Sequence, residues 1–277
     1  MSTIGKALAL LDLLSQLDGD VGLSDCARLA SLDKATARRM LVELEKHGFV
    51  EQDAESRKYR LGSAPVRLAR IREARYPFIG VAAPLVKALA EDAGETVHLA
   101  EFAGGRLSTV HVEDAPQAHR VIVKLGTILP FHATASGLAF LAFCPQAEIA
   151  SALSKPLERF SKHTITDPDE FRLRLSETAE RGFSISQQGL EEGVISAAAP
   201  VLSPGGRPIG TVAIAAPVLR ANDTKMNELG VKAALTANRI AEKYYGAKTS
   251  QGTGTIMGVP ADGSTFGKTK DPRYRNG

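Results

Sequence analysis

The first 62 residues carry the pattern that most restricts the fold, because three short helices are followed at once by a hairpin. Apolar residues at helical spacing predict the first helix, which ends before a pair of glycines. Ser24 is expected to cap a second helix, and Asp33 a third that runs to about His47. The segments GFVEQ and RKYRLG flank a polar turn and predict two short strands. This order is typical of a winged helix-turn-helix, which we place at residues 1–62.

The third predicted helix has one apolar side and one largely basic side. Steps of three and four residues bring together Ala37, Met40, Leu41 and Leu44. The opposite side carries Ala35, Arg38, Arg39, Val42 and Lys46. The net charge of the chain is only +3, which by itself does not indicate a nucleic-acid binder. Residues 33–75, however, hold 11 basic and 7 acidic residues, so the basic excess is local.

The basic side of this helix is suited to the major groove of DNA. A helix that enters the groove with its N-terminal half presents side chains to base edges, and the donors of arginine match guanine. Arg38 and Arg39 are therefore predicted to read bases, while Lys34 suits a phosphate. A few charges on one helix face usually indicate only a solvated surface, but the helix-helix-hairpin context favours DNA contact. The predicted DNA-binding residues are Ser24, Lys34, Ala35, Thr36, Arg38, Arg39, Arg57 and Lys58.

Beyond the hairpin, the pattern changes to helices mixed with hairpins. Residues 63–77 predict a linker helix, with Pro65 near its start and Pro77 past its end. Residues 78–247 alternate between the two kinds of element without strict βαβ order, which predicts an α+β domain on an antiparallel sheet. Strands are expected at 95–103, 106–113, 120–125, 194–203 and 207–217. Helices are expected at 84–94, 134–143, 168–181 and 223–245.

Composition indicates the expected cellular compartment of the protein. The two cysteines form no C-x-x-C pair, which argues against a disulfide framework and makes a reducing cytoplasm the expected compartment. The N-terminal apolar stretch is interrupted by Asp12 and lacks a basic leader, so neither a signal peptide nor membrane association is expected. Residues 248–277 are rich in Gly, Thr, Ser and Lys, and we expect this tail to be disordered.

Signals for catalysis or cofactor binding are weak. Ser136 in TASGL lacks the preceding glycine of a nucleophile elbow. The segment GTGTIMG resembles a dinucleotide loop but follows no predicted strand, so we expect no cofactor. His98 and His111 lie on neighbouring predicted strands, where a zinc site is an alternative to ordinary hydrogen-bonded histidines. A sensor or enzyme domain whose N-terminal unit only mediates dimerisation therefore remains the alternative to a DNA-binding regulator.

Several segments together resemble one family. LSDCARLASLDKATARRMLVELEKHGFVEQD followed by YRLG resembles the DNA-binding half of IclR-type bacterial transcriptional regulators. The resemblance continues through GETVHLAE, LPFHATASGLAFLA, RGFSISQQGLEEGV and SAAAPV, and spans about residues 4–246. It implies a winged helix-turn-helix, a linker helix and a GAF-like effector domain. It further implies a regulator, more often a repressor, that binds a palindromic operator as a homodimer or dimer of dimers and responds to a small organic acid.

The resemblance also implies where the organic acid would lie. The loop HATASG would close over it, and the helix that opens after Thr134 would direct backbone N–H groups at a carboxylate. The implied effector-binding residues are Leu129, Thr134, Ala135, Ser136, Gly137, Ser186, Ser196, Ala213 and Ala215. The alternative for the small residues among them is close packing of a helix on a sheet.

Three features of the sequence depart from the family pattern. Leu138 stands where a lysine is usual, SISQQ replaces a segment that is commonly acidic, and Ala213 and Ala215 stand where some relatives carry serines. These changes predict a less polar cavity, suited to an aromatic or larger acid rather than a small keto acid.

Overall fold

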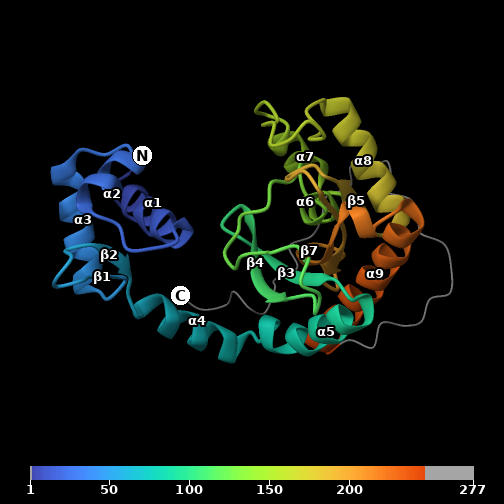
Figure 1. The fold of residues 1–277 in the computed structure, drawn as a ribbon, viewed down its shortest axis with the longest axis horizontal. Helices are drawn as coiled ribbons and strands as arrows, with labels where there is room; N and C mark the ends of the chain where they lie inside the picture. The colour runs from blue at the N-terminus through green and yellow to red at the C-terminus, as the bar shows by residue number, and fades with distance from the viewer. Residues whose placement is uncertain (1, 247–277) are drawn as a thin grey trace.

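The computed structural model describes residues 2–246 (Figure 1). The predicted tail at 248–277 and its GTGTIMG segment lie outside these described residues. An N-terminal unit and a larger domain built on a sheet are joined by helix α4, which runs between them in Figure 1.

The N-terminal unit forms the predicted three helices and hairpin. Its elements are α1 (Thr3–Gln16), α2 (Leu23–Leu29), α3 (Lys34–Lys46), β1 (Val50–Gln52) and β2 (Tyr59–Leu61). The carboxylate of Asp33 accepts the Thr36 backbone N–H at 2.8 Å, which caps α3 as predicted. Gly48 follows α3 with a φ of +73°, a conformation that glycine adopts without strain.

The predicted cap at Ser24 is wrong. Helix α2 begins at Leu23, and its N-cap is Gly22, which offers no side-chain hydrogen bond. Val21 pairs with Tyr59 through two backbone hydrogen bonds of 2.9 and 2.8 Å. This pairing keeps the chain extended up to Gly22, so the helix starts earlier and Ser24 lies exposed in its first turn.

The core of the N-terminal unit is small and shared by all of its elements. Leu10, Cys26 and Leu41 are fully buried, and Val50 and Tyr59 of the hairpin pack against them. The predicted faces of α3 are confirmed, because the residues assigned to its apolar side are buried or half-buried and those assigned to its basic side are exposed. Burial of one side thus fixes the other toward solvent.

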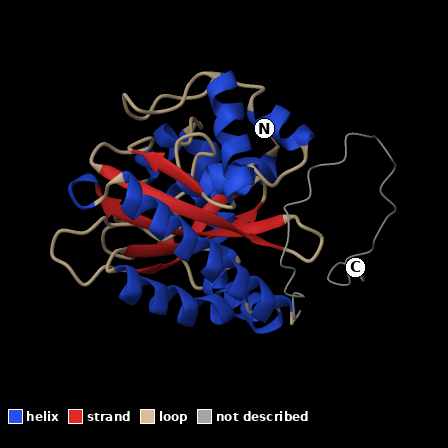
Figure 2. Cartoon of the chain, turned by 90° about the vertical axis from the view of Figure 1, so that its right-hand side faces the viewer, coloured by secondary structure: helices blue, strands red, loops and turns tan. Residues whose placement is uncertain are grey.

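The linker and the second domain follow. The helices are α4 (Ala64–Arg75), α5 (Phe78–Ala93), α6 (Ala135–Leu141), α7 (Gln146–Ala152), α8 (Pro168–Arg181) and α9 (Asp223–Tyr245), with a short 3₁₀ turn η1 (Val218–Arg220). The strands are β3 (Thr96–Ala103), β4 (Arg106–Glu113), β5 (Ser184–Gln187), β6 (Val194–Leu202) and β7 (Pro208–Pro217). The sheet is antiparallel, with strand order β4-β3-β7-β6-β5, and helices lie on either side of it in Figure 2.

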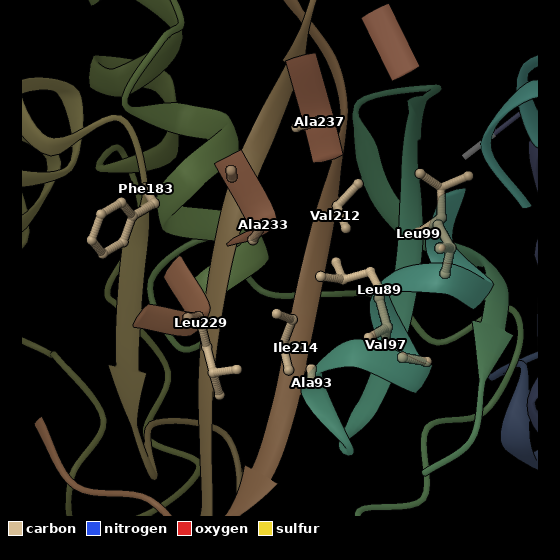
Figure 3. Close-up of a cluster of buried hydrophobic side chains, with 14 of the residues drawn as sticks. Leu89, Ala93, Val97, Leu99, Phe183, Val212, Ile214, Leu229, Ala233 and Ala237 are labelled. Atoms are coloured by element: carbon tan, nitrogen blue, oxygen red, sulfur yellow. The ribbon is translucent and has the colours of Figure 1, made fainter. Parts of the chain in front are cut away.

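The two faces of this sheet are covered to different extents. Val97, Leu99, Val212 and Ile214 point to one face and pack on α5 and α9, as the close-up in Figure 3 shows for Leu89 and Leu229 of those helices among others. The intervening residues point to the other face, which α6 covers in part through an alanine cluster. That second face is left partly open, and a cavity forms there.

The strand predicted at 120–125 is wrong. Residues 119–125 form an irregular segment, and only 126–129 run alongside β4, through backbone hydrogen bonds between Thr109 and Thr127 (2.9 Å) and between Leu107 and Leu129 (2.8 Å). The apolar residues that suggested a strand line a cavity instead. Helix α7 and strand β5 were not predicted, because both are short and β5 is largely polar in sequence.

The helices of residues 2–246 were compared with the length and hydropathy that a bilayer requires. Within this range, no helix is both long and apolar enough to span a membrane.

Candidate DNA-binding surface and candidate effector cavity

Helix α3 presents a basic surface that is free to meet a ligand. Lys34, Arg38 and Arg39 are exposed along its first turns. Arg57 and Lys58 are exposed at the tip of the hairpin, where Arg57 takes a φ of +58°. Within residues 2–246, none of these five cations forms an ion pair with an acidic side chain. The surface therefore keeps its charge available to a polyanion.

Three further predicted residues lie beside these cations. Ser24 and Ala35 are exposed, and Thr36 is half-buried. The Thr36 hydrogen bonds to Asp33 hold the pKa of that carboxyl below its usual range. The ionised cap fixes the start of α3, so the helix presents its first two turns in a defined orientation.

A cavity of about 290 Å³ lies on the open face of the sheet. Its floor is formed by β3, β5, β6 and β7, and its remaining lining comes from the start of α6 and from residues 121–127 and 189–191. The lining residues are His98, Val121, Ile122, Val123, Lys124, Thr127, Leu129, Ala133, Thr134, Ala135, Ser136, Ser186, Gly189, Leu190, Glu191, Val194, Ser196 and Ala215. Eight of these side chains are polar or charged, but most of the cavity surface is formed by apolar atoms, which agrees with the predicted low polarity.

The register of the sheet decides which floor residues reach the cavity. Ser186, Ser196 and Ala215 are direct cross-strand neighbours, and all three line it. The next row contains Ala213, which is buried beneath α6 in contact with Ala135. Ala213 therefore does not line the cavity, and its predicted ligand contact is replaced by helix–sheet packing.

Gly137 does not line the cavity either, although it was predicted to allow close approach. A Cβ atom at this position would lie 2.4 Å from the Phe131 Cα and 2.5 Å from the Pro130 carbonyl oxygen. The close approach is thus real, but it serves packing of α6 on its preceding loop. Leu138, the position where a lysine is usual in the family, is buried in an apolar cluster with Leu129 and Phe140.

Thr134 lines the cavity but its hydroxyl is already engaged. It accepts the Gly137 N–H at 2.9 Å and donates to the Pro130 carbonyl at 2.9 Å. Since α6 has only seven residues and one of its first amides is taken by this cap, the start of α6 is a weak anchor for a carboxylate. The carboxylate of a ligand is therefore expected to bind elsewhere in the cavity.

His98 is a polar residue of the floor that the sequence analysis did not assign to the effector site. It is 6% exposed, and burial lowers its pKa from 6.5 to about 4, so the ring is neutral at pH 7. Its Nε2 lies 3.4 Å from the Ser136 hydroxyl, and its Nδ1 has no partner among the described residues. His98 pairs with Val112 and His111 with Leu99, so the two histidines point to opposite faces and do not form the alternative zinc site.

The irregular segment at 119–127 is held at both ends, since Gly126 and Thr127 bond to Thr109 of β4 and side chains hold its start. Arg220 donates to both carboxylate oxygens of buried Glu95, at 2.9 and 2.6 Å, and to the His119 carbonyl. Thr96 donates to the Val121 carbonyl at 2.8 Å. These contacts hold the start of the segment at the sheet, while Ile122 and Lys124 beyond them lie exposed at the rim of the cavity.

Sequence reasoning missed the residues that this segment and the 189–191 turn contribute. The apolar residues at 120–125 predicted a strand, and nothing in a single sequence distinguishes apolar residues that face a cavity from those that face a sheet. The one sequence feature that could have indicated the rim of the cavity is the apolar run at 121–123 followed by Lys124.

Comparison with known families follows the same division of the chain. Residues 3–54 match the IclR helix-turn-helix domain, and residues 74–242 match the bacterial transcriptional regulator IclR C-terminal domain. Both descriptions are of transcriptional regulators, not of enzymes.

Individual relatives cover most of the chain. A glycerol operon regulatory protein of Streptomyces coelicolor is 33% identical over 79% of this chain and 86% of its own length. The transcriptional repressor IclR of Escherichia coli is 24% identical over 90% of this chain and 92% of its own length.

Two solved structures share the fold. A protein of Silicibacter sp. TM1040, assigned to the IclR regulators, superimposes with a TM-score of 0.80 at 34% identity, covering 89% of this chain and 97% of its own. An IclR homologue of Microbacterium hydrocarbonoxydans, complexed with 4-hydroxybenzoate, gives 0.73 at 24% identity, covering 87% and 100%. With its helix-turn-helix, its five-stranded antiparallel sheet and these matches, the chain belongs to the IclR family of bacterial transcriptional regulators.

Proposed function

We propose that this regulator is a repressor that binds a two-fold symmetric operator as a homodimer, alone or as a dimer of dimers, and leaves it when a small organic acid enters the cavity. The observation that carries the proposal is the pair Arg38 and Arg39, exposed and without acidic partners among residues 2–246 on a helix whose other side is buried. Repression is favoured because the Escherichia coli relative is itself a repressor.

The DNA contacts divide by chemistry. Arg38 and Arg39 read base edges, since their forked donors match guanine, and Ala35 between them and the helix start suits an apolar contact. Lys34, Thr36 and Ser24 hold phosphates around the start of α3. Arg57 and Lys58 extend the contact to the neighbouring backbone or minor groove. This division separates specificity from affinity.

The homodimer is supported by helix α4. It has 12 residues, and among them only Ala64 is buried, while Val66, Leu68 and Ile71 are exposed. A helix of this length is marginal in water without packing. A second copy of the chain would cover these side chains and would place two recognition helices on one DNA duplex.

The cavity suits a monocyclic acid. Its volume of about 290 Å³ lies near the lower end of small-molecule sites, and its walls are mainly apolar. The relative that holds 4-hydroxybenzoate makes this acid the first probe to test. Ser136, Ser186, Ser196 and His98 supply neutral polar groups on the floor. Leu129, Thr134, Ala135 and Ala215 complete the proposed contacts.

The DNA-binding part is tested by fluorescence anisotropy with a duplex from the region upstream of the gene and a shuffled duplex of equal composition. We expect preference for the upstream duplex, and affinity for both that falls as salt is raised. Equal affinity for both duplexes would instead support the alternative, a sensor whose N-terminal unit only mediates dimerisation.

The effector part is tested by a thermal-shift screen of 4-hydroxybenzoate, larger aromatic acids, glyoxylate and pyruvate, followed by titration into the DNA complex. Aromatic acids are expected to raise the melting temperature and to release the DNA. Tight binding of glyoxylate or pyruvate with none of the larger acids would contradict the predicted apolar cavity. Tighter DNA binding upon addition of the acid would show an activator-like response.

A further inference from the structure

Lys124 belongs to two structural features at once. It lines the rim of the cavity. Its Nζ also lies 2.9 Å from each carboxylate oxygen of Asp18, in the connection between α1 and α2 of the DNA-binding unit. One ammonium group therefore joins the cavity to the domain that carries the recognition helix.

Charge within the cavity restricts where an anion would bind. Among the described lining residues, the ionised side chains are Lys124 and Glu191, both exposed at the rim, while His98 on the floor is buried and neutral. A carboxylate placed among the neutral groups of the floor would lose its hydration without gaining an opposite charge. At the rim it keeps contact with water and meets the ammonium of Lys124.

We infer that the effector is a monocarboxylate with an apolar body and a neutral hydrogen-bonding group, which places its carboxylate on Lys124 and so takes this lysine away from Asp18. The inference rests on the proposed function and deepens it. The neutral group lies at the far end, beside His98 and Ser136, whose side chains face the cavity 3.4 Å apart.

The exchange is a substitution of one carboxylate for another on the same cation. The anchored start of the 119–127 segment, held by Arg220 and Thr96, keeps Lys124 close to the cavity, so the side chain does not follow Asp18 if the domains separate. Asp12 with Arg106 (2.7 Å) and Arg72 with Glu101 remain as ion pairs between the N-terminal unit or linker and the sheet domain. Loss of the Asp18 contact therefore loosens the arrangement of the two units without detaching them.

Linkage sets the size of the effect. The Lys124 and Asp18 side chains are 66% and 84% exposed, and exposed ion pairs contribute little. Replacing Asp18, which competes with the effector for Lys124, is therefore expected to tighten effector binding by roughly 2- to 5-fold. By reciprocity, the bound effector weakens the domain contact by the same factor.

The ion pair itself is tested without any ligand. A carbodiimide joins a carboxylate to an amine that touches it, so the full-length protein is treated with this reagent and its peptides are analysed by mass spectrometry. We expect a cross-link between Asp18 and Lys124. Lys232 and Asp92, 2.7 Å apart within the sheet domain, provide the internal control. A control cross-link without the Asp18–Lys124 product would overturn the inference.

The exchange is tested by calorimetry with 4-hydroxybenzoate on the full-length wild type, Asp18→Asn, Lys124→Gln and Asp20→Asn. Asp20 lies in the same connection and loses the same charge, but it pairs with Arg60 within the DNA-binding unit. We expect tighter binding by Asp18→Asn, weaker binding by Lys124→Gln and an unchanged affinity in Asp20→Asn.

The outcomes separate this inference from the proposed function. If the wild type binds the acid but Asp18→Asn matches Asp20→Asn, the exchange is wrong while an acid-responsive regulator stands. If neither 4-hydroxybenzoate nor any other monocarboxylate of the screen binds the wild type, the proposed effector class and the exchange fail together, even where the cross-link is found.

Discussion

At the residue scale, the function of α3 depends on which side chains are held and which are free. Ala37 and Leu41 are fully buried, and the Asp33 cap fixes the first turn. The adjacent Arg38 and Arg39 must then face solvent, because neighbouring positions on a helix differ by about 100°. The same burial that stabilises the unit therefore positions the groups that are proposed to read DNA.

Arg39→Ala and Lys34→Ala are expected to weaken DNA binding in different ways. Loss of Arg39 removes a base contact and should cost roughly 1 to 3 kcal/mol on the operator, with a smaller loss on shuffled DNA. Loss of Lys34 removes a phosphate contact and should weaken both complexes alike. Anisotropy titrations with the two duplexes measure the difference.

Lys46→Ala is the matched control for these variants. Lys46 lies in the last turn of the same helix and is paired with Glu43 at 2.9 Å, away from the residues assigned to the groove. Its replacement should leave both affinities nearly unchanged. Equal losses on operator and shuffled DNA for Arg39→Ala and Lys34→Ala would contradict the assigned roles.

Burial of His98 predicts a pH dependence of stability. Its folded-state pKa of about 4 lies below the ordinary value of 6.5, so the unfolded chain takes up a proton that the folded chain excludes. The contribution of neutral His98 is fully present above pH 6.5 and is lost as pH falls toward 4. Between pH 7 and 5 the wild type should lose roughly 2 kcal/mol from this source.

Urea denaturation of the wild type and His98→Gln at both pH values measures this contribution. The variant lacks the titrating ring, so its stability should fall by about 2 kcal/mol less over the same interval. His47→Gln, at an exposed histidine, serves as the control and should follow the wild type. A wild-type profile identical to that of His98→Gln would show that burial does not lower the pKa of the ring in the folded protein.

At the element scale, the helices and strands that carry their own local signals could be predicted from sequence. The Asp33 cap and the glycine turns at 104–105 and 204–206 fixed the bounds of α3 and of two hairpins within a few residues. Residues 120–125 carried a strand pattern too, but β4 pairs with only 126–129 on that side. Whether an apolar run becomes a strand depends on a partner distant in sequence, which local patterns do not contain.

Gly230 tests the packing of α9 on the edge of the sheet. A Cβ atom there would lie 2.2 Å from the Phe183 ring, which is buried beneath the helix. Alanine favours a helix by up to about 1 kcal/mol over glycine, whereas overpacking costs about 1 to 3 kcal/mol. Gly230→Ala should therefore destabilise the protein.

Gly80→Ala provides the comparison for that substitution. Gly80 lies in α5, and the nearest atom to its added Cβ would be 3.5 Å away, an ordinary contact. With no clash, helix propensity should dominate and the variant should be slightly more stable than the wild type. Urea denaturation measures both variants, and a stabilised Gly230→Ala would show that Phe183 moves aside freely.

At the scale of the whole molecule, the cavity was only partly predictable. Leu129, Ser136, Ser186, Ser196 and Ala215 were predicted from the family resemblance, and the structure brings them together. The rim residues at 121–124 and the floor residue His98 were not assigned, because they meet only when the sheet register and an irregular segment are known.

Dimerisation is predicted to depend on exposed leucines of the N-terminal unit and linker. Leu8 lies exposed on α1, whose other side packs in the core of the N-terminal unit, and Leu68 lies exposed on α4, of which only Ala64 is buried. Covering them with a second copy removes apolar surface from water, and a buried aspartate there would lose its hydration. Leu8→Asp and Leu68→Asp should each shift the protein toward monomer in sedimentation equilibrium.

Leu173→Asp separates this effect from a general response to surface charge. Leu173 of α8 is 57% exposed, close to the 55% of Leu8, but it belongs to the sheet domain. The Leu173→Asp variant should remain as dimeric as the wild type. In the proposed dimer two recognition helices bind a symmetric operator together, so the monomeric variants should also bind a full operator no better than a single half-site. A monomeric variant that kept full-operator affinity would show that one α3 helix suffices for recognition.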